Sequence, residues 1–193
     1  MGKREKAAVV KRPATTKAAV TKASARTSWT PAGVQAREGM PSPYMTEILS
    51  RRQPLAVLYA ADTLERVEHV REGVPAALLE VMSEDMGMPK EKLYTALRLP
   101  RATVNRKLQA KQTLSPDESE RVLGLARLVG QVEAMVRESG EPEGFDAARW
   151  LAEWLERPNP ALSRKRPAEF LDTADGRVLV SDLLSRMSSG AYS

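Results

Sequence analysis

The pattern of apolar and polar positions between residues 75 and 112 predicts three short helices separated by two tight corners. The first helix, residues 76–85, places its apolar side chains three and four positions apart, which is the period of an amphipathic helix. Pro89 cannot continue that helix and instead suits the first position of the second one. Pro100 ends the second helix, because the residue before a proline avoids the helical region. The third helix is then residues 101–110, and two helices joined by a turn of three or four residues are typical of a helix-turn-helix.

The third of these helices carries side chains of the kind that read DNA. Only Val104 and Leu108 are placed to face inward, so its other faces are polar. Arg and Lys bind guanine edges, Asn binds adenine, and Thr meets a phosphate or a thymine methyl group. Residues 89–112 hold seven Lys or Arg against one Glu, a charge that suits a phosphate backbone, although a solvated basic helix would look similar. The predicted DNA contacts are Arg98, Arg101, Thr103, Asn105, Arg106, Lys107 and Lys111.

Capping residues mark the helices on either side of this motif. Asp62 suits the N-cap of a helix that Gly73 stops, and Ser115 with Glu118 forms a capping box in front of a long helix. The long helix is expected to reach about Arg137 and carries two apolar stripes, more than one neighbouring helix covers. It is therefore either a central strut of the core or a dimerisation surface.

The C-terminal part of the chain continues the helical pattern. Asp146 caps a helix that carries Trp150, and a single helical turn over residues 167–171 follows. Asp172 and Asp175 are interpreted as caps of the last helix rather than as catalytic carboxylates, because no base or nucleophile accompanies them. The side chains expected to face the core from the last helix are Leu179, Val180, Leu183, Leu184 and Met187. Together these patterns predict an all-α fold.

Charge divides the chain into three parts. Residues 1–26 hold eight Lys or Arg and one Glu, residues 27–140 hold fifteen of each sign, and residues 141–193 hold seven basic and nine acidic side chains. Residues 1–43 have too few apolar side chains for a core, so we expect a disordered basic arm. Such an arm either adds non-specific affinity for DNA or only raises solubility. Residues 54–61 form an apolar run that suits a buried helix or a strand.

The residue types argue against several classes of function. The absence of Cys leaves no disulfide or thiolate site, which is compatible with the cytoplasm. No stretch of eighteen consecutive apolar residues is present, so no membrane-spanning helix is expected. With one His and no Cys, the sequence offers neither a metal-ligand cluster nor a nucleophile with its base. We therefore expect no enzyme activity, cofactor, metal or small-molecule substrate.

From Trp150 onward, a set of positions follows a known family pattern: Pro158, Asn159, Pro160, Ala161, Leu162, Pro167, Leu171, Asp172, Thr173, Gly176 and Gly190. With these residues the sequence resembles the toxin-binding domain of the Xre–MbcA–ParS antitoxins. The helices upstream resemble the Xre-type DNA-binding half of the same proteins, so the resemblance covers about residues 60–193. One departure is the loop in which the family has glycines, because this chain has Ser163, Arg164 and Lys165 there.

The resemblance implies an antitoxin that also represses its own promoter. It implies an Xre-like helix-turn-helix domain (44–138) and a helical toxin-binding domain (139–193), whereas the basic arm (residues 1–43) is expected from composition and is not part of the family pattern. The implied partners are operator double-stranded DNA and a RES-domain toxin, an NAD-consuming enzyme of ADP-ribosyltransferase-like fold whose active-site cleft the antitoxin covers. A homodimer within a larger hetero-oligomer is expected. The alternative is a stand-alone helix-turn-helix regulator whose C-terminal part dimerises or senses a signal.

The last helix and the tail after it are the predicted toxin contact. If the apolar side of that helix packs in the core, its other side and the tail remain for a partner. Tyr192 offers a flat apolar ring with one hydroxyl, and Arg186 offers charge, the two kinds of side chain that most often dominate interfaces. The predicted toxin-binding residues are Trp150, Asn159, Arg177, Ser181, Arg186, Ser189, Gly190, Ala191, Tyr192 and Ser193.

Overall fold

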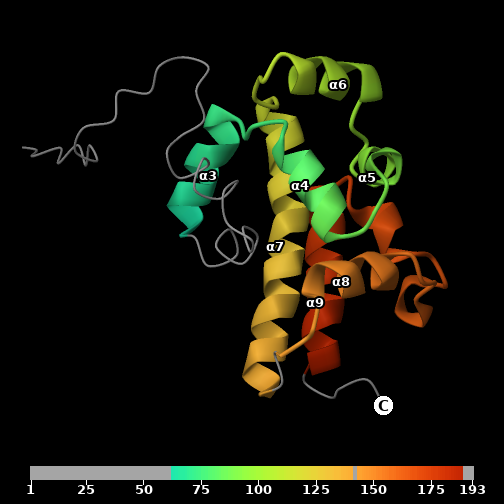
Figure 1. The fold of residues 1–193 in the computed structure, drawn as a ribbon. Helices are drawn as coiled ribbons and strands as arrows, with labels where there is room; N and C mark the ends of the chain where they lie inside the picture. Colours follow the sequence, from blue (N-terminus) through green and yellow to red (C-terminus); the bar gives the residue numbers. More distant parts are fainter. Residues whose placement is uncertain (1–61, 141–142, 189–193) are drawn as a thin grey trace, which may run out of the picture. The chain divides into compact units, whose positions relative to one another are not determined.

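Residues 62–140 and 143–188 are described by a computed structural model, in which they are helical and contain no strand (Figure 1). The helices are α3 (Thr63–Glu72), α4 (Leu78–Asp85), α5 (Lys90–Ala96), α6 (Arg101–Gln109), α7 (Pro116–Ser139), α8 (Ala147–Leu155) and α9 (Ala174–Ser188), with short 3-10 turns η1 (Pro160–Leu162) and η2 (Pro167–Phe170). Over these residues the all-α prediction is confirmed. The predicted arm (1–43), the apolar run (54–61) and the tail (189–193) lie outside the described residues.

Helix α7 is the strut around which the other described helices are arranged. Its first turn has the predicted capping box, in which the amide of Glu118 donates to the Ser115 hydroxyl (3.3 Å) and the amide of Ser115 donates to the Glu118 carboxylate (2.7 Å). The helix ends at Gly140, whose φ of 89° is in the left-handed region that favours glycine. Helices α3, α8 and α9 all pack against α7 (Figure 1). The interpretation of α7 as a central strut is therefore confirmed.

The helix-turn-helix is formed by α5 and α6, with residues 98–100 as the turn between them. Leu93 of α5 and Val104 of α6 are fully buried, so both helices rest on the core through apolar side chains. The chain after α6 is tied back to the start of α4, because the amide of Ala76 donates to the carbonyl of Gln112 (3.1 Å). This hydrogen bond closes the segment that contains α4, α5 and α6.

The corner between α3 and α4 fits only glycine. Gly73 has a φ of 83°, and a Cβ atom there would lie 2.4 Å from the carbonyl oxygen of Leu114. The predicted helix stop at Gly73 is therefore also a close approach of two backbone segments.

Helices α8 and α9 extend the same core rather than forming a second one. Leu151 and Leu155 of α8 and Val180 and Leu184 of α9 are buried in one continuous apolar cluster with α4, α5 and α7. The expectation for Leu179 was wrong, because that side chain is 40% exposed. Three apolar residues in succession cannot all face inward from one helix, and here Val180 faces the core.

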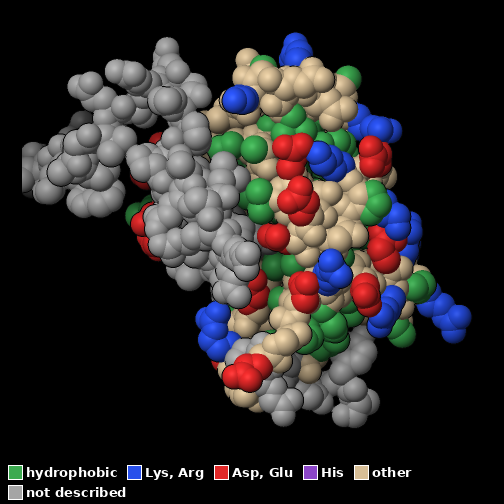
Figure 2. Space-filling model, in the orientation of Figure 1, with side chains coloured by type: hydrophobic (Ala, Val, Ile, Leu, Met, Phe, Trp, Pro, Cys, Tyr) green, Lys and Arg blue, Asp and Glu red, His purple; other side chains and the backbone are tan. Residues whose placement is uncertain are grey.

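The face seen in Figure 2 shows how charge is distributed over the described residues. Lys and Arg side chains lie at the α6 end, and acidic side chains begin below it and alternate with basic ones (Figures 1 and 2). None of the described helices combines the length and the apolar run that crossing a bilayer requires.

Candidate DNA-reading surface and toxin-binding region

Helix α6 presents most of its predicted DNA contacts to solvent. Val104 is its buried residue, and this single anchor on the core leaves the polar faces outward. Five of the seven predicted contacts are exposed and Thr103 is half-buried. The five are Arg98, Arg101, Asn105, Arg106 and Lys111. The chemistry needed to contact bases and phosphates is therefore available on one exposed helix and its flanking turns.

Lys107 differs from the other predicted contacts, and the expectation that its side chain is exposed was wrong. Its Nζ lies 2.5 Å from a carboxylate oxygen of Glu118, and the two side chains are 15% and 9% exposed. Burial alone would raise the pKa of the Glu118 carboxyl, but hydrogen bonds from Lys107 and Ser115 outweigh it and hold that pKa below its usual value. Lys107 therefore fastens α6 to the first turn of α7.

Two further cations of the motif have acidic neighbours at its surface. The Arg101 guanidinium lies 3.2 Å from the Glu91 carboxylate on α5. The Nε of Arg98 lies 3.1 Å from an oxygen of Asp172, a residue of the C-terminal part of the chain. Asp172 had been interpreted as a helix cap, but the amide of Gly176 donates to the hydroxyl of Thr173 instead. The partner of Arg98 was missed because nothing in the sequence places residues 98 and 172 together.

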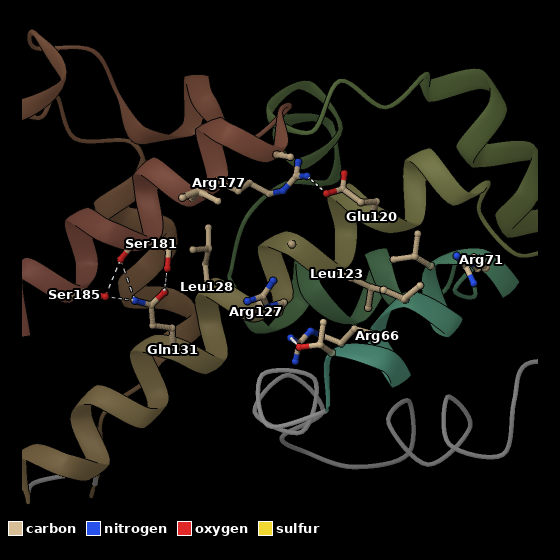
Figure 3. Close-up of a pocket in the computed structure, with 16 residues that line it drawn as sticks. Arg66, Arg71, Glu120, Leu123, Arg127, Leu128, Gln131, Arg177, Ser181 and Ser185 are labelled. Atoms are coloured by element: carbon tan, nitrogen blue, oxygen red, sulfur yellow. Dashed lines mark hydrogen bonds and ion pairs between the residues drawn. The ribbon is translucent and has the colours of Figure 1, made fainter. Parts of the chain in front are cut away.

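Arg177 is buried rather than exposed toward a partner, so this expectation was wrong. Only 6% of the residue is exposed, and its Nη1 donates to the carbonyl of Leu171 (2.8 Å) while its Nη2 pairs with Glu120 of α7 (Figure 3). Gly124 of α7 provides the space, because a Cβ there would lie 2.3 Å from the Nε of Arg177. A buried guanidinium requires such partners, which the sequence pattern of α9 does not reveal.

Ser181 is also turned toward the protein. Its hydroxyl donates to Oε1 of Gln131 (2.8 Å), whose Nε2 donates to the carbonyl of Ser181 (3.0 Å) and the hydroxyl of Ser185 (2.9 Å) (Figure 3). These bonds join α9 to α7 along one edge of a groove of about 610 Å³ between α3, α7 and α9. Ser181 is half-buried, and both its hydroxyl and its carbonyl are hydrogen-bonded to Gln131. Its predicted contact with a toxin stays a prediction.

The outward face of α9 is more apolar than the sequence analysis expected. Val178 is 60% and Leu179 is 40% exposed, and both were missed as surface residues. The signal was the run of three apolar residues at 178–180, of which the helix buries only one. Arg186 is exposed further along α9, while Ser189, Gly190, Ala191, Tyr192 and Ser193 lie outside the described residues.

Aromatic side chains of α8 stack along the edge of the core. The rings of Trp150 and Trp154 are stacked with centroids 6.2 Å apart, and Phe145 lies 6.1 Å from Trp150. Both Trp residues are half-buried and packed on the core, whereas Phe145 is 40% exposed. Trp150 thus has a packing role, and its predicted contact with a toxin stays a prediction.

Asn159 organises the loop between α8 and η2. Its side-chain Oδ1 accepts from the backbone amide of Ala161 (2.9 Å). Its backbone amide donates to the carbonyl of Lys165 (3.0 Å). Within this loop Ser163 and Arg164 have φ values of 55° and 63°, in the left-handed region that glycine adopts most easily. The loop therefore has a glycine-like backbone at the two positions where the resembled family has glycines. A direct contact of Asn159 with a toxin stays a prediction.

Together, the fold and these surfaces define a helix-turn-helix protein whose helix α6 shares a core with a small C-terminal helical region. Residues 65–127 match the family described as the antitoxin Xre-like helix-turn-helix domain, and residues 143–190 match the antitoxin Xre/MbcA/ParS C-terminal toxin-binding domain. The chain belongs to this antitoxin family.

Named relatives agree with this assignment. A protein of Sphingobium sp. (strain YBL2) named "Prs ADP-ribosylating antitoxin" is 45% identical over 135 residues, which is 70% of this chain and 85% of the relative. "Antitoxin Xre" of Yersinia enterocolitica (serotype O:8 / biotype 1B) is 25% identical over 66% of this chain and 80% of its own length. "Antitoxin Xre" of Pseudomonas putida (KT2440) is 28% identical over 48% of this chain and 52% of the relative. The chain is therefore an antitoxin with a helix-turn-helix and a toxin-binding domain, rather than a stand-alone regulator, and the names are consistent with a protein that is not an enzyme.

Proposed function

We propose that this antitoxin neutralises an NAD-consuming RES-domain toxin by covering its active-site cleft, and that it represses its own operon through α6. In this proposal the antitoxin acts as a homodimer within a larger complex with the toxin. The observation that carries the proposal is the exposed, cationic α6 on the same core as the toxin-binding region.

The DNA half of the proposal rests on the surface of α6. Asn105 and Arg106 are exposed in the middle of the helix, where side chains of a reader helix reach base edges. Lys111 is exposed in the turn after the helix, where a cation meets the phosphate backbone irrespective of sequence. Specificity is therefore assigned to Asn105 and Arg106, and non-specific affinity to Lys111.

The toxin half rests on the toxin-binding domain and on the relative from Sphingobium, whose name contains ADP-ribosylation. ADP-ribosylation takes its ADP-ribose from NAD, so a toxin with this chemistry has a cleft for two phosphates and two riboses. The outward face of α9 offers apolar Val178 and Leu179 together with the cation Arg186. Apolar and cationic groups of this kind suit the occlusion of such a cleft.

The DNA half is tested by operator binding of single variants. Arg106→Ala and Asn105→Ala are each expected to cost about 1–3 kcal/mol on the operator and to relax specificity at one base position. Lys111→Ala should weaken binding to operator and to scrambled duplex by about the same factor. The measurement is titration of both duplexes at one fixed salt concentration. Unchanged operator affinity in both the Arg106 and Asn105 variants would remove α6 from the role of reader.

The occlusion of the toxin is tested by co-expression with the gene beside the antitoxin gene. Growth and cellular NAD are the readouts, and we expect the antitoxin to restore both. If expression of the toxin alone stops growth without lowering cellular NAD, and the antitoxin still restores growth, the toxin is not NAD-consuming.

A further inference from the structure

The turn in front of the reader helix is held from behind by α7. Arg121 of α7 donates from Nη1 to the carbonyl oxygens of Leu97 (3.1 Å) and Arg98 (3.0 Å). Arg98 itself has a φ of 47°, a left-handed conformation that a side-chain-bearing residue adopts only where its surroundings enforce it. The backbone of this turn is thus fixed, and the Arg98 side chain starts from a defined point three residues before α6 begins at Arg101.

The acceptor of that side chain belongs to the toxin-binding region. Asp172, whose side chain is 16% exposed, lies 3.1 Å from the Nε of Arg98, whose side chain is 79% exposed. On one side of Asp172, Leu171 is buried and accepts a hydrogen bond from the buried Arg177. On its other side, Thr173 caps the start of α9. The carboxylate therefore extends from an anchored segment, whereas most of the guanidinium side chain that meets it is exposed to solvent.

These contacts form a closed connection between the two family regions. The neighbouring α7 residues Glu120 and Arg121 contact different regions, Glu120 the Arg177 of α9 and Arg121 the helix-turn-helix corner. Asp172 and Arg98 complete the connection at the surface. An exposed ion pair contributes little to stability. The effect of the Arg98–Asp172 pair is therefore to determine the position of the Arg98 charge.

We propose that Asp172 is a positioning residue for DNA binding, which holds the charge of Arg98 away from DNA phosphates in the free antitoxin. This inference rests on the proposed DNA binding through α6. An Arg side chain stays charged at every relevant pH, and the Nε of Arg98 faces Asp172, so a phosphate that approaches the same guanidinium also meets the negative charge of that carboxylate. The toxin-binding region thereby limits the non-specific attraction of the reader corner to DNA.

The proposal predicts a change in salt dependence, which a purely structural role of Asp172 would not produce. Removing the carboxylate frees Arg98 for one more phosphate contact, and each such contact steepens the plot of log affinity against log salt by about 0.9. Between 50 and 200 mM salt, Asp172→Asn should therefore lose affinity by about 3.5-fold more than the unaltered protein. The probe is a 20-base-pair duplex of scrambled sequence, titrated with the full chain over this salt range.

Asp175→Asn is the matched control, because it removes the same charge from an exposed residue in the first turn of α9. A salt slope in Asp175→Asn as steep as in Asp172→Asn would reduce the effect to overall charge and overturn the proposal. Equal slopes for Asp172→Asn and the unaltered protein would overturn it as well. If the unaltered protein shows no salt-dependent binding to any duplex, it is the proposed DNA binding that fails.

Arg98→Gln gives a second test, and its first part, made with Asp172 in place, does not depend on the folding of the Asp172 variant. With Asp172 in place, Arg98→Gln should leave the salt slope nearly unchanged, because Arg98 is already engaged. In the Asp172→Asn protein the same change should reduce the slope by about 0.9. A loss of this size in the Asp172-containing protein would mean that Arg98 already contacts phosphate, and it would refute the proposal. Helix content and melting temperature, measured by circular dichroism, accompany each variant.

Discussion

Replacing Gly124 with alanine is expected to destabilise the protein, even though alanine is the better helix former. Gly124 lies within α7, where the intrinsic preference of alanine over glycine is worth about 1 kcal/mol. A Cβ atom at this position would, however, lie 2.3 Å from the Nε and 2.5 Å from the Cδ of Arg177. The Arg177 side chain must therefore move. The higher helix preference of alanine stabilises the protein, whereas the displacement of Arg177 destabilises it.

The magnitude follows from the contacts that Arg177 loses. A hydrogen bond to a charged group contributes about 1.5–3 kcal/mol, and the bond from Arg177 to the Leu171 carbonyl is buried. The ion pair with Glu120 loses less free energy when Arg177 moves, because the Glu120 side chain is 45% exposed and can follow the guanidinium. Loss of the buried bond, less the gain in helix preference, leaves a net destabilisation of about 0.5–2 kcal/mol. For a chain of this size that lowers the melting temperature by about 1–8 °C.

The assay is a thermodynamic cycle of thermal or urea unfolding, followed by circular dichroism. Gly124→Ala is made alone and in the Arg177→Ala protein, where no long side chain lies over residue 124. In that background the clash is absent, so Gly124→Ala should stabilise by about 1 kcal/mol, a reversal of sign. Stabilisation by Gly124→Ala in both backgrounds would refute the reasoning, because it would mean that Arg177 moves aside without loss.

Three further predictions concern Glu118 at the junction of α6 with α7, Glu133 further along α7, and the end of α9. The pKa of Glu118 is lowered in the folded protein, so its contribution to stability is present above its unfolded pKa and is lost as pH falls through the folded one. Glu118→Gln should therefore destabilise by about 1–3 kcal/mol at pH 7 but much less at pH 3, as measured by urea unfolding, since Lys107 loses its charged partner. Burial raises the pKa of Glu133, so Glu133→Gln should have the opposite effect and stabilise the protein at pH 7. If each variant changes the free energy of unfolding by the same amount at pH 7 and pH 3, these assignments are contradicted. Truncation after Ser188, or Arg186→Glu, should weaken growth rescue beside the toxin while helix content and operator binding stay intact, and full protection by the truncated protein would place the occlusion elsewhere.

The sequence predicted the helices well because their limits depend on local chemistry. The capping box of Ser115 and Glu118, the stop at Gly73 and the break at Pro100 act within a few residues, and all three are present in the structure. The exposure of single side chains depends on distant residues instead. Arg177 is buried because Gly124, more than fifty positions earlier, leaves room for it.

The same limit explains the errors on the two candidate surfaces. Lys107 looks like one more cation of a DNA-reading helix, and only the fold brings it to the Glu118 carboxylate. In α9, periodicity alone could not decide which apolar residues at 178–180 face outward, because the buried Arg177 takes part of the inward face. The assignment of polar residues to partners was thus less secure than the assignment of helices.

The shared core also determines how the two activities have to be separated experimentally. Buried side chains of α7 belong to one apolar cluster with those of the helix-turn-helix and of the C-terminal helices, so a core substitution weakens both regions together. Loss of DNA binding and loss of toxin neutralisation in such a variant would report unfolding and not function. Exposed positions avoid this, because Arg106 on α6 and Arg186 on α9 lie on separate elements away from the buried cluster. Opposite selective losses in these two variants are therefore the evidence that would assign DNA reading to α6 and toxin binding to the end of α9.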